Sequence, residues 1–172
     1  MNNYIYADNA ATTKLSLKAY EEMKKYLLDD YSNPSQPYSF SCKSKQAIKN
    51  ARMIIAECIN ASSDEIFFTS GGSESNSWAI KCSGLIPNLR NGFVSAIEHH
   101  SVLNSFALFN SFVEIGVDSK GLVNPQDLEK ALSNNSEPSA SSETKFVSIM
   151  MGNNEIGTEE PIKQLADRKS VV

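Results

Sequence analysis

The run Thr69–Asn76 (Thr-Ser-Gly-Gly-Ser-Glu-Ser-Asn) carries the clearest chemical pattern in this sequence. An apolar, β-prone run, Ile66–Phe68, precedes it, and a helical pattern from Trp78 to Leu85 follows. Two glycines stand where a strand must turn sharply into a helix, because glycine adopts positive φ and lets a ligand approach the backbone. The first N–H groups of such a helix lack intrahelical acceptors and, together with the helix dipole, favour an anion. The pattern therefore predicts phosphate binding at this strand-to-helix corner.

A simpler interpretation explains the same corner as an ordinary strand-to-helix turn with Ser73 as the N-cap of the helix. The glycine spacing matches neither the Walker loop nor G-x-G-x-x-G, so neither nucleotide-binding fingerprint applies. From this stretch alone, both interpretations remain open.

Two further polar clusters follow apolar runs. Glu98-His99-His100 comes after Phe93–Ile97, and Asn153-Asn154-Glu155 comes after Phe146–Met151. Ligands of parallel sheets collect outside the carboxyl ends of the strands. Imidazole takes and gives protons near neutral pH, and a side-chain amide donates to oxygen. Three such clusters on one rim favour a ligand site over three unrelated turns, with His100 as a solvent-facing neighbour.

Short apolar runs alternate with helical patterns in this chain, which predicts an α/β fold with a mainly parallel sheet and flanking helices. Strands are expected at Ile66–Thr69, Phe93–Ile97, Phe112–Val117 and Phe146–Met151. Helices are expected at Leu17–Leu27 behind Ser16 as N-cap, about Phe40–Asn60, after Ser73, near Val102 with Leu103, Phe106 and Phe109 on one face, Pro125–Leu132 behind Asn124, and from Pro161. Turns or loops are expected at Asn88–Gly92, Asp118–Gly121 and Ser133–Glu143.

Composition narrows the function classes. The 172 residues carry a net charge of −4 without a basic stripe, which argues against a nucleic-acid partner. The amino terminus is polar and no apolar run reaches transmembrane length, so we expect a cytoplasmic protein without a membrane partner. Cys42, Cys58 and Cys82 form no C-x-x-C pair, which predicts no metal site, and we expect Cys58 and Cys82 to be small buried hydrophobic residues.

With these clusters in place, the sequence resembles the N-terminal portion of cysteine desulfurases of the NifS/IscS type, pyridoxal-phosphate (PLP) enzymes of the class-V aminotransferase family. The resemblance runs from Tyr4 to about Ala166 and rests on five motifs in order: Ala7–Thr13, Asn33–Ser35, Ile66–Asn76, Glu98–Leu103 and Asn153–Gly157. It implies part of a fold type I aminotransferase large domain. The arm would cover residues 1–14 and the incomplete PLP-binding domain residues 15–172, with the C-terminal small domain absent.

The resemblance also implies roles for single residues. Gly72 and Ser73 would hold the phosphate of the cofactor. His99 would be the catalytic residue, which stacks on the pyridine ring and shuttles protons, and Asn154 would bind the ring hydroxyl. The residues near the substrate, L-cysteine, would be Asn9, Thr12 and Asn33.

Several positions depart from the family pattern. Tyr38 and Ser41 occupy places where the family usually has histidine and glycine, and the loop Asn134–Glu143 is longer than the family needs. The resemblance fades at Arg168–Val172. No Asp-Ala-x-Gln, no Ser-x-His-Lys and no loop with a persulfide-forming cysteine follows. We therefore expect this chain, as it stands, to lack the lysine that binds PLP covalently and to be inactive alone.

In the whole enzyme, the resemblance implies conversion of cysteine to alanine and an enzyme persulfide, for iron–sulfur cluster or thio-cofactor assembly. A homodimer and a sulfur-acceptor or scaffold protein would be its partners. The alternatives are a non-catalytic remnant or interaction module that binds a partner such as a full-length desulfurase, and a selenocysteine lyase-like fragment. A generic phosphate-binding domain would leave His99 and Asn154 without a role.

Overall fold

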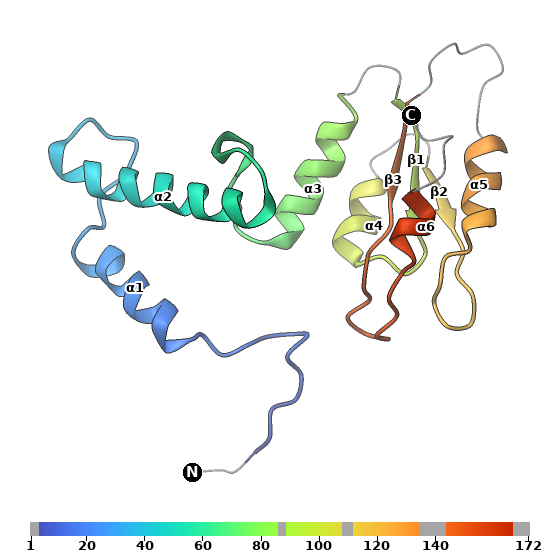
Figure 1. The fold of residues 1–172 in the computed structure, drawn as a ribbon, viewed down its shortest axis with the longest axis horizontal. Helices are drawn as coiled ribbons and strands as arrows, with labels where there is room; N and C mark the ends of the chain where they lie inside the picture. Colours follow the sequence, from blue (N-terminus) through green and yellow to red (C-terminus); the bar gives the residue numbers. More distant parts are fainter. Residues whose placement is uncertain (1–3, 86–88, 108–111, 135–143, 167–172) are drawn as a thin grey trace. The chain divides into compact units, whose positions relative to one another are not determined.

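The computed structural model describes residues 4–85, 89–107, 112–134 and 144–166, which form two compact units, Met1–Phe68 and Thr69–Val172 (Figure 1). Each unit is described by itself. The first contains α1 (Leu17–Leu28), α2 (Cys42–Ile59) and the 3₁₀ turns η1 (Ser39–Ser41) and η2 (Ser63–Glu65). The helices of the second are α3 (Gly72–Ser83), α4 (His100–Phe106), α5 (Pro125–Asn134) and α6 (Ile162–Ala166), and its strands are β1 (Leu89–Ser95), β2 (Phe112–Ile115) and β3 (Thr144–Ser148).

The two long helices of the first unit follow their sequence signals. Ser16 is the N-cap of α1, and its Oγ accepts a hydrogen bond from the Ala19 N–H at 3.1 Å. The helix expected over about Phe40–Asn60 is confirmed as α2, preceded by η1. It ends at Ile59, and the C-cap residue Asn60 adopts the left-handed backbone (φ 55°) that is common after helices.

The expected strand Ile66–Thr69 is wrong, because none of these residues joins a sheet among the described residues. A strand is stable only when its backbone groups find partners on a neighbouring strand. Here the Arg52 side chain supplies one of the hydrogen bonds that a neighbouring strand would otherwise make. Its Nε donates to the Ile66 carbonyl oxygen at 3.2 Å, and its guanidinium lies over the Phe68 ring at 5.4 Å from the centroid.

The sheet of the second unit has the strand order β2-β1-β3, and both pairings are parallel. This confirms the expected mainly parallel α/β architecture. The turn expected at Asn88–Gly92 is wrong from Leu89 onward, because β1 already begins there. Gly92 lies inside the strand, opposite Phe112 and Phe146. Its missing side chain makes room for the Phe106 ring, since a Cβ there would lie 2.6 Å from Phe106 Cε1.

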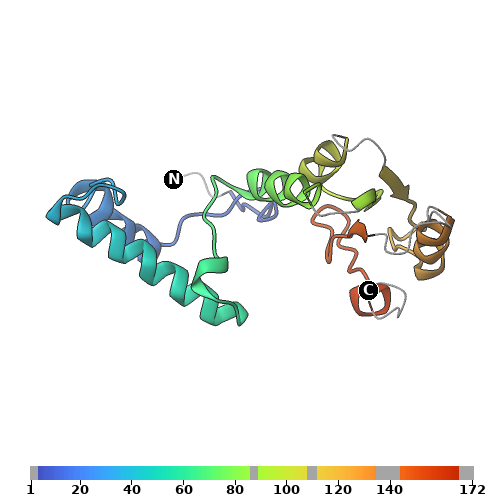
Figure 2. The ribbon, with the colours of Figure 1, turned by 90° about the horizontal axis from the view of Figure 1, so that it is seen from above.

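Helices cover both faces of the sheet, with α4 and α6 on opposite sides (Figure 2). Neighbouring residues of β1 point to opposite faces, as a strand requires. The face toward α5 and α6 has a core of Phe93, Ile115, Val123, Leu128 and Leu165. The face toward α3 and α4 has a core of Ile80, Val94, Val102 and Phe106. Phe109, expected on the same face of α4, lies outside the described residues.

The expected burial of Cys58 and Cys82 is wrong, since both thiols are exposed, as is Cys42. The buried positions of α2 are Ser44 and Ala56, so Cys58 lies on another face of that helix. In α3, Ile80 and Ser83 are buried instead of Cys82. The sequence pattern therefore predicts correctly that Cys58 and Cys82 lie in helices. It does not predict which face of each helix packs against other residues.

Other expected elements are confirmed with small shifts. Asn124 precedes α5, and its Oδ1 accepts from the Gln126 N–H at 2.8 Å, with Pro125 as first helical residue. The apolar run expected as a strand over Phe146–Met151 forms β3 slightly earlier, and α6 begins directly after Pro161. Most of the long loop expected after Ser133, residues 135–143, lies outside the described residues.

Candidate functional site

The Gly-Gly-Ser corner forms the N-terminus of α3, which begins at Gly72 with Gly71 as N-cap. Ser73 is the second helical residue, so its interpretation as the N-cap is wrong. Gly71 is extended (φ 165°), and left-handed glycines occur elsewhere, so the corner does not use positive φ as we expected. A Cβ added at either glycine would meet nothing within 4 Å. The glycines thus leave open space around the helix end.

The first-turn N–H groups of Gly72, Ser73 and Glu74 have no acceptor within the helix. No side chain caps the helix either. The Glu74 carboxylate instead accepts from the N–H and the Oγ of the preceding Ser70, both at 2.6 Å, and these bonds lower the pKa of Glu74. Thr69 Oγ1 donates to the Gly71 carbonyl at 3.1 Å. The corner is therefore internally fixed, while its helix-end donors remain available to an anion.

His99 is the N-cap of α4, the helix that follows β1. Its Nδ1 accepts from the Ser101 N–H at 3.1 Å and lies 2.8 Å from Ser101 Oγ. His99 is an exposed residue. His100, the first residue of α4, is also exposed, which agrees with a solvent-facing neighbour. His99 thus caps a helix with one ring nitrogen and leaves the other edge accessible.

Asn76 joins the corner to His99. Its Nδ2 on α3 donates to Ser101 Oγ on α4 at 2.9 Å, and both side chains are partly buried. The structure therefore brings Gly72, Ser73 and His99 into one region. The sequence prediction did not assign a role to Asn76 or Ser101. The available signal was their spacing, since Asn76 lies one helical turn after Gly72 and Ser101 lies two residues after His99.

The loop after β3 is tied to the loop after β1. Asn153 Nδ2 donates to the Ile97 carbonyl at 3.0 Å, and the Met150 N–H donates to Glu98 Oε1. Asn153 Oδ1 accepts from the N–H of Glu155 at 2.8 Å, which shapes the turn. Asn154 itself is exposed. Asn153 thus builds the loop, and Asn154 is the residue that it presents.

Glu98 lies buried beneath this rim. Its Oε1 accepts from the Met150 N–H and from Ser95 Oγ at 3.2 Å. Burial raises the pKa of Glu98, and the charge of Glu160 adds to the effect. Glu160 is also buried and accepts from the Val123 N–H at 3.0 Å. Both carboxylates therefore serve as internal acceptors that hold loops to the sheet.

The three residues expected near the substrate belong to the first unit, and that role stays a prediction. Asn9 is exposed in a turn closed by the Ala11 N–H on the Asp8 carbonyl at 3.2 Å. Thr12 Oγ1 is 2.5 Å from the Tyr6 hydroxyl. Asn33 is exposed, and its Oδ1 accepts from the Ser35 N–H at 2.9 Å.

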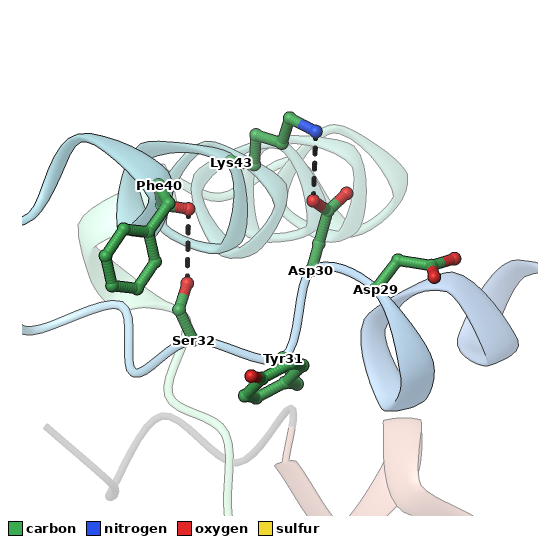
Figure 3. Close-up of a pocket in the computed structure, with 6 residues that line it drawn as sticks. All are labelled: Asp29, Asp30, Tyr31, Ser32, Phe40 and Lys43. Atoms are coloured by element: carbon green, nitrogen blue, oxygen red, sulfur yellow. Dashed lines mark hydrogen bonds and ion pairs between the residues drawn. The ribbon is translucent and has the colours of Figure 1, made fainter.

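A pocket of about 150 Å³ lies between the end of α1 and the start of α2 (Figure 3). Lys43 Nζ pairs with Asp30 Oδ1 at 3.0 Å, and Ser32 Oγ donates to the Phe40 carbonyl at 3.2 Å. The residues that line it are Asp29, Asp30, Tyr31, Ser32, Phe40 and Lys43. These contacts join the two helices, so the pocket is explained by local packing.

The two departures from the family pattern have local roles beside this pocket. Tyr38 stacks on Phe40, with centroids 5.2 Å apart and an interplanar angle of 11°. Ser41 is buried, and its Oγ has no hydrogen-bond partner among the described residues. Tyr38 therefore takes part in packing, and Ser41 carries an unsatisfied hydroxyl where the family has glycine.

The donor set of the second unit fits pyridoxal phosphate. Free helix-end N–H groups suit a phosphate, an exposed imidazole face suits an electron-poor ring, and the Asn154 amide suits a ring oxygen. Within the described ranges, no group of three His, Cys, Asp or Glu residues could hold a metal ion. In the same ranges, no helix is long and apolar enough to cross a membrane.

Comparison with known proteins shows the family of this chain. The family model described as aminotransferase class-V matches residues 5–170. Cysteine desulfurase IscS of Clostridium botulinum is 37% identical over 97% of this chain and 42% of its own length. IscS of Dictyoglomus turgidum is 41% identical over 96% of this chain and 42% of its own length. This chain thus spans less than half the length of these relatives.

Solved structures show the same likeness. A NifS-like protein from Rickettsia africae is 31% identical, with a TM-score of 0.79, over 95% of this chain and 44% of its own. SspA, solved in complex with cysteine, is 32% identical, with a TM-score of 0.77, over 94% of this chain and 46% of its own. Sequence and fold therefore agree that this chain belongs to the class-V aminotransferase family, where it resembles the N-terminal portion of NifS/IscS cysteine desulfurases.

Proposed function

We propose that this chain forms the N-terminal part of the PLP site of a cysteine desulfurase. The observation that carries the proposal is the hydrogen-bonded link from Asn76 through Ser101 to His99. This link holds the uncapped N-terminus of α3 and an exposed imidazole in one region of the second unit. A phosphate donor set beside an aromatic base is what a pyridoxal phosphate site requires.

Each residue then has one task. The N–H groups of Gly72 and Ser73, with the Ser73 hydroxyl, would hold the phosphate. The His99 ring would stack on the cofactor ring and move protons. The Asn154 amide would donate to the ring hydroxyl oxygen. Met150 and Asn153 support the last task, because they tie the Asn154 loop to the loop that carries His99.

The substrate of the whole enzyme is L-cysteine. Pyridoxal phosphate, when bound, supplies an electron sink for the amino acid. By resemblance to the family, Asn9, Thr12 and Asn33 would take part in binding that substrate in the whole enzyme. The products are alanine and an enzyme persulfide, whose sulfur serves iron–sulfur cluster or thio-cofactor assembly. The whole enzyme works in the cytoplasm as a homodimer. It transfers the sulfur to an acceptor or scaffold protein.

Amide NMR of the full chain tests the site. Titration with PLP should shift the resonances of Gly71–Ser75 and His99, whereas inorganic phosphate should shift those of Gly71–Ser75 alone. Ser73→Ala should weaken both titrations, and His99→Ala should weaken only that with PLP. His100→Ala is the matched control and should change neither. Shifts confined to other parts of the chain, with this corner silent, would refute the proposal.

A non-catalytic interaction module is the second candidate, favoured by the apolar surface of the first unit. No residue of α1 is buried, and Leu17, Tyr20 and Leu27 are exposed. Such faces promote association. Sedimentation of the full chain alone, and mixed with an intact NifS-type desulfurase, tests it. A complex with the desulfurase together with no PLP-induced shifts would favour the module, whereas PLP-induced shifts without a complex would exclude it.

A further inference from the structure

We infer that Asn76 and Ser101 are positioning residues that hold neutral His99 in the tautomer with its proton on Nε2. The inference deepens the proposed function, because it specifies which atom His99 offers to a cofactor or substrate. The tautomer itself is a property of this chain without any ligand, so it is open to a separate test.

The first step concerns the hydrogen bond from the Ser101 backbone. The Ser101 N–H can only donate, and it points to His99 Nδ1 at 3.1 Å. A neutral imidazole has one donor and one acceptor nitrogen, and the bond made by one nitrogen decides the role of the other. Nδ1 must therefore carry the lone pair, and the proton must reside on Nε2.

The second step concerns the Ser101 hydroxyl. Asn76 Nδ2 donates to Ser101 Oγ at 2.9 Å, and Oγ lies 2.8 Å from His99 Nδ1. Because Nδ1 carries the lone pair that accepts from the Ser101 N–H, the 2.8 Å contact requires the hydroxyl to donate to Nδ1, while a lone pair of Oγ accepts from the Asn76 amide. Ser105, the nearest other hydroxyl in this helix, donates to the Ser101 carbonyl at 2.7 Å and does not compete for Oγ. The Asn76 amide and the Ser101 hydroxyl thus donate in the same direction toward His99, and two hydrogen bonds in series strengthen one another.

The third step concerns the exposed edge of the ring. With Nδ1 engaged by two donors of Ser101, Nε2 is the ring nitrogen of this exposed residue that is left for a ligand. His99 therefore presents a proton to give, and it can take one only after Nε2 has released its own or the Nδ1 contacts have broken. His100 has no hydrogen bond to its ring among the described residues, so the only other histidine of the chain is an internal reference.

NMR with imidazole ¹⁵N labelling of the full chain at about pH 8, where histidine is mostly neutral, tests the inference. The two-bond and three-bond ¹H–¹⁵N correlations report the tautomer of each histidine. The measured quantity is the ratio of the Nε2–H tautomer to the Nδ1–H tautomer. Without PLP, we expect His99 to be protonated mainly on Nε2 and to have a higher ratio than His100. Asn76→Asp should lower the His99 ratio about threefold to tenfold, the factor supported by one net hydrogen bond, because a carboxylate accepts the Ser101 hydroxyl proton.

The matched variants separate positioning from folding. Asn104→Asp adds the same charge to exposed α4 and should leave the His99 ratio unchanged. Ser101→Ala should lower the ratio, and Ser101→Thr, which keeps the hydroxyl, should restore it. Asn76→Asp decides the matter if Ser101→Ala unfolds, as judged by loss of the β1 amide dispersion. A wild-type His99 ratio equal to that of His100, or one unchanged in Asn76→Asp, would overturn the inference.

Addition of PLP then tests the proposed function separately. A correct tautomer with no PLP-induced change at the His99 Nε2 would refute the cofactor role and leave the positioning role standing. A PLP-induced change at Nε2, without any effect of Asn76→Asp on the tautomer ratio, would refute the positioning role and leave the cofactor role standing.

Discussion

Replacement of Gly92 by alanine tests how tightly α4, the helix that His99 caps, is seated on the sheet. Gly92 lies in β1 beneath the ring of Phe106, the last residue of that helix. The new Cβ would lie 2.6 Å from Phe106 Cε1 and 3.0 Å from Cδ1. Carbon atoms pack best at about 3.5–4.0 Å, so the contact is short by roughly 1 Å.

The ring cannot avoid the new methyl group cheaply. Phe106 is fully buried and stacks on Phe146 with centroids 5.6 Å apart. Overpacking of this kind costs about 1–3 kcal/mol. Restricting the unfolded chain by a glycine-to-alanine change returns about 0.4–1 kcal/mol. Taking the middle of each range, we therefore expect Gly92→Ala to destabilise the second unit by about 1.3 kcal/mol.

Amide hydrogen exchange of β1 measures the opening free energy of this unit. Gly116→Ala is the matched control, because a Cβ there meets nothing within 4 Å, and it should be neutral or slightly stabilising. The double variant Gly92→Ala with Phe106→Leu should be less destabilised than the sum of the single variants, since the smaller side chain relieves the clash. Additive effects, or a Gly92→Ala chain as stable as the wild type, would refute the packing argument.

Three further variants follow from the same structure. Ser41→Ala should stabilise the first unit by about 1 kcal/mol in thermal unfolding, because it removes a buried hydroxyl without a partner; a loss of stability would reveal that the hydroxyl is bonded. Burial raises the pKa of Glu98, so the folded chain keeps a proton that the unfolded chain releases, and its stability should fall as the pH rises above the ordinary carboxyl pKa. The Glu98→Gln variant should lack that fall in stability. The urea unfolding midpoints of the wild type and the variant should therefore diverge between about pH 4 and 7. Midpoints that change in parallel with pH would contradict this expectation. Glu74→Gln should increase phosphate affinity at the α3 corner about twofold to fivefold in an NMR titration, because it removes a negative charge from the first turn; unchanged or weaker binding would argue against an anion site there.

Patterns local in the sequence predicted most elements of the second unit. The apolar runs at Phe112 and Phe146 became β2 and β3, and Asn124-Pro125 started α5, since alternation, caps and turns depend on neighbouring residues. Prediction failed where a distant partner decides the outcome. Ile66–Thr69 has strand-forming residues, but a strand also needs a neighbour. Gly92 suggested a turn, but it lies in a strand, where the absence of a side chain makes room for the Phe106 ring.

The candidate site shows the same division. Gly72, Ser73, His99 and Asn154 were assigned from motifs, and the structure places the first three in one region. The supporting contacts were not predictable, because Asn76 and Ser101 lie 25 residues apart and meet only through the packing of α3 on α4. Asn153 was similarly hidden, since its bond to Ile97 spans 56 residues.

These sequence separations bear on the order in which the site assembles during folding. The contacts among α3, β1 and α4 close loops of a few tens of residues, whereas the Asn154 loop depends on bonds that span 52 and 56 residues. Short loops close at lower entropic cost and precede long ones. We therefore expect the Gly71–Ser73 corner and His99 to form before the Asn154 loop docks. The Asn154 loop docks last and acts as the closing piece of the rim, so substitutions at Glu98 or Asn153 should delay a late folding phase and leave the early one unchanged.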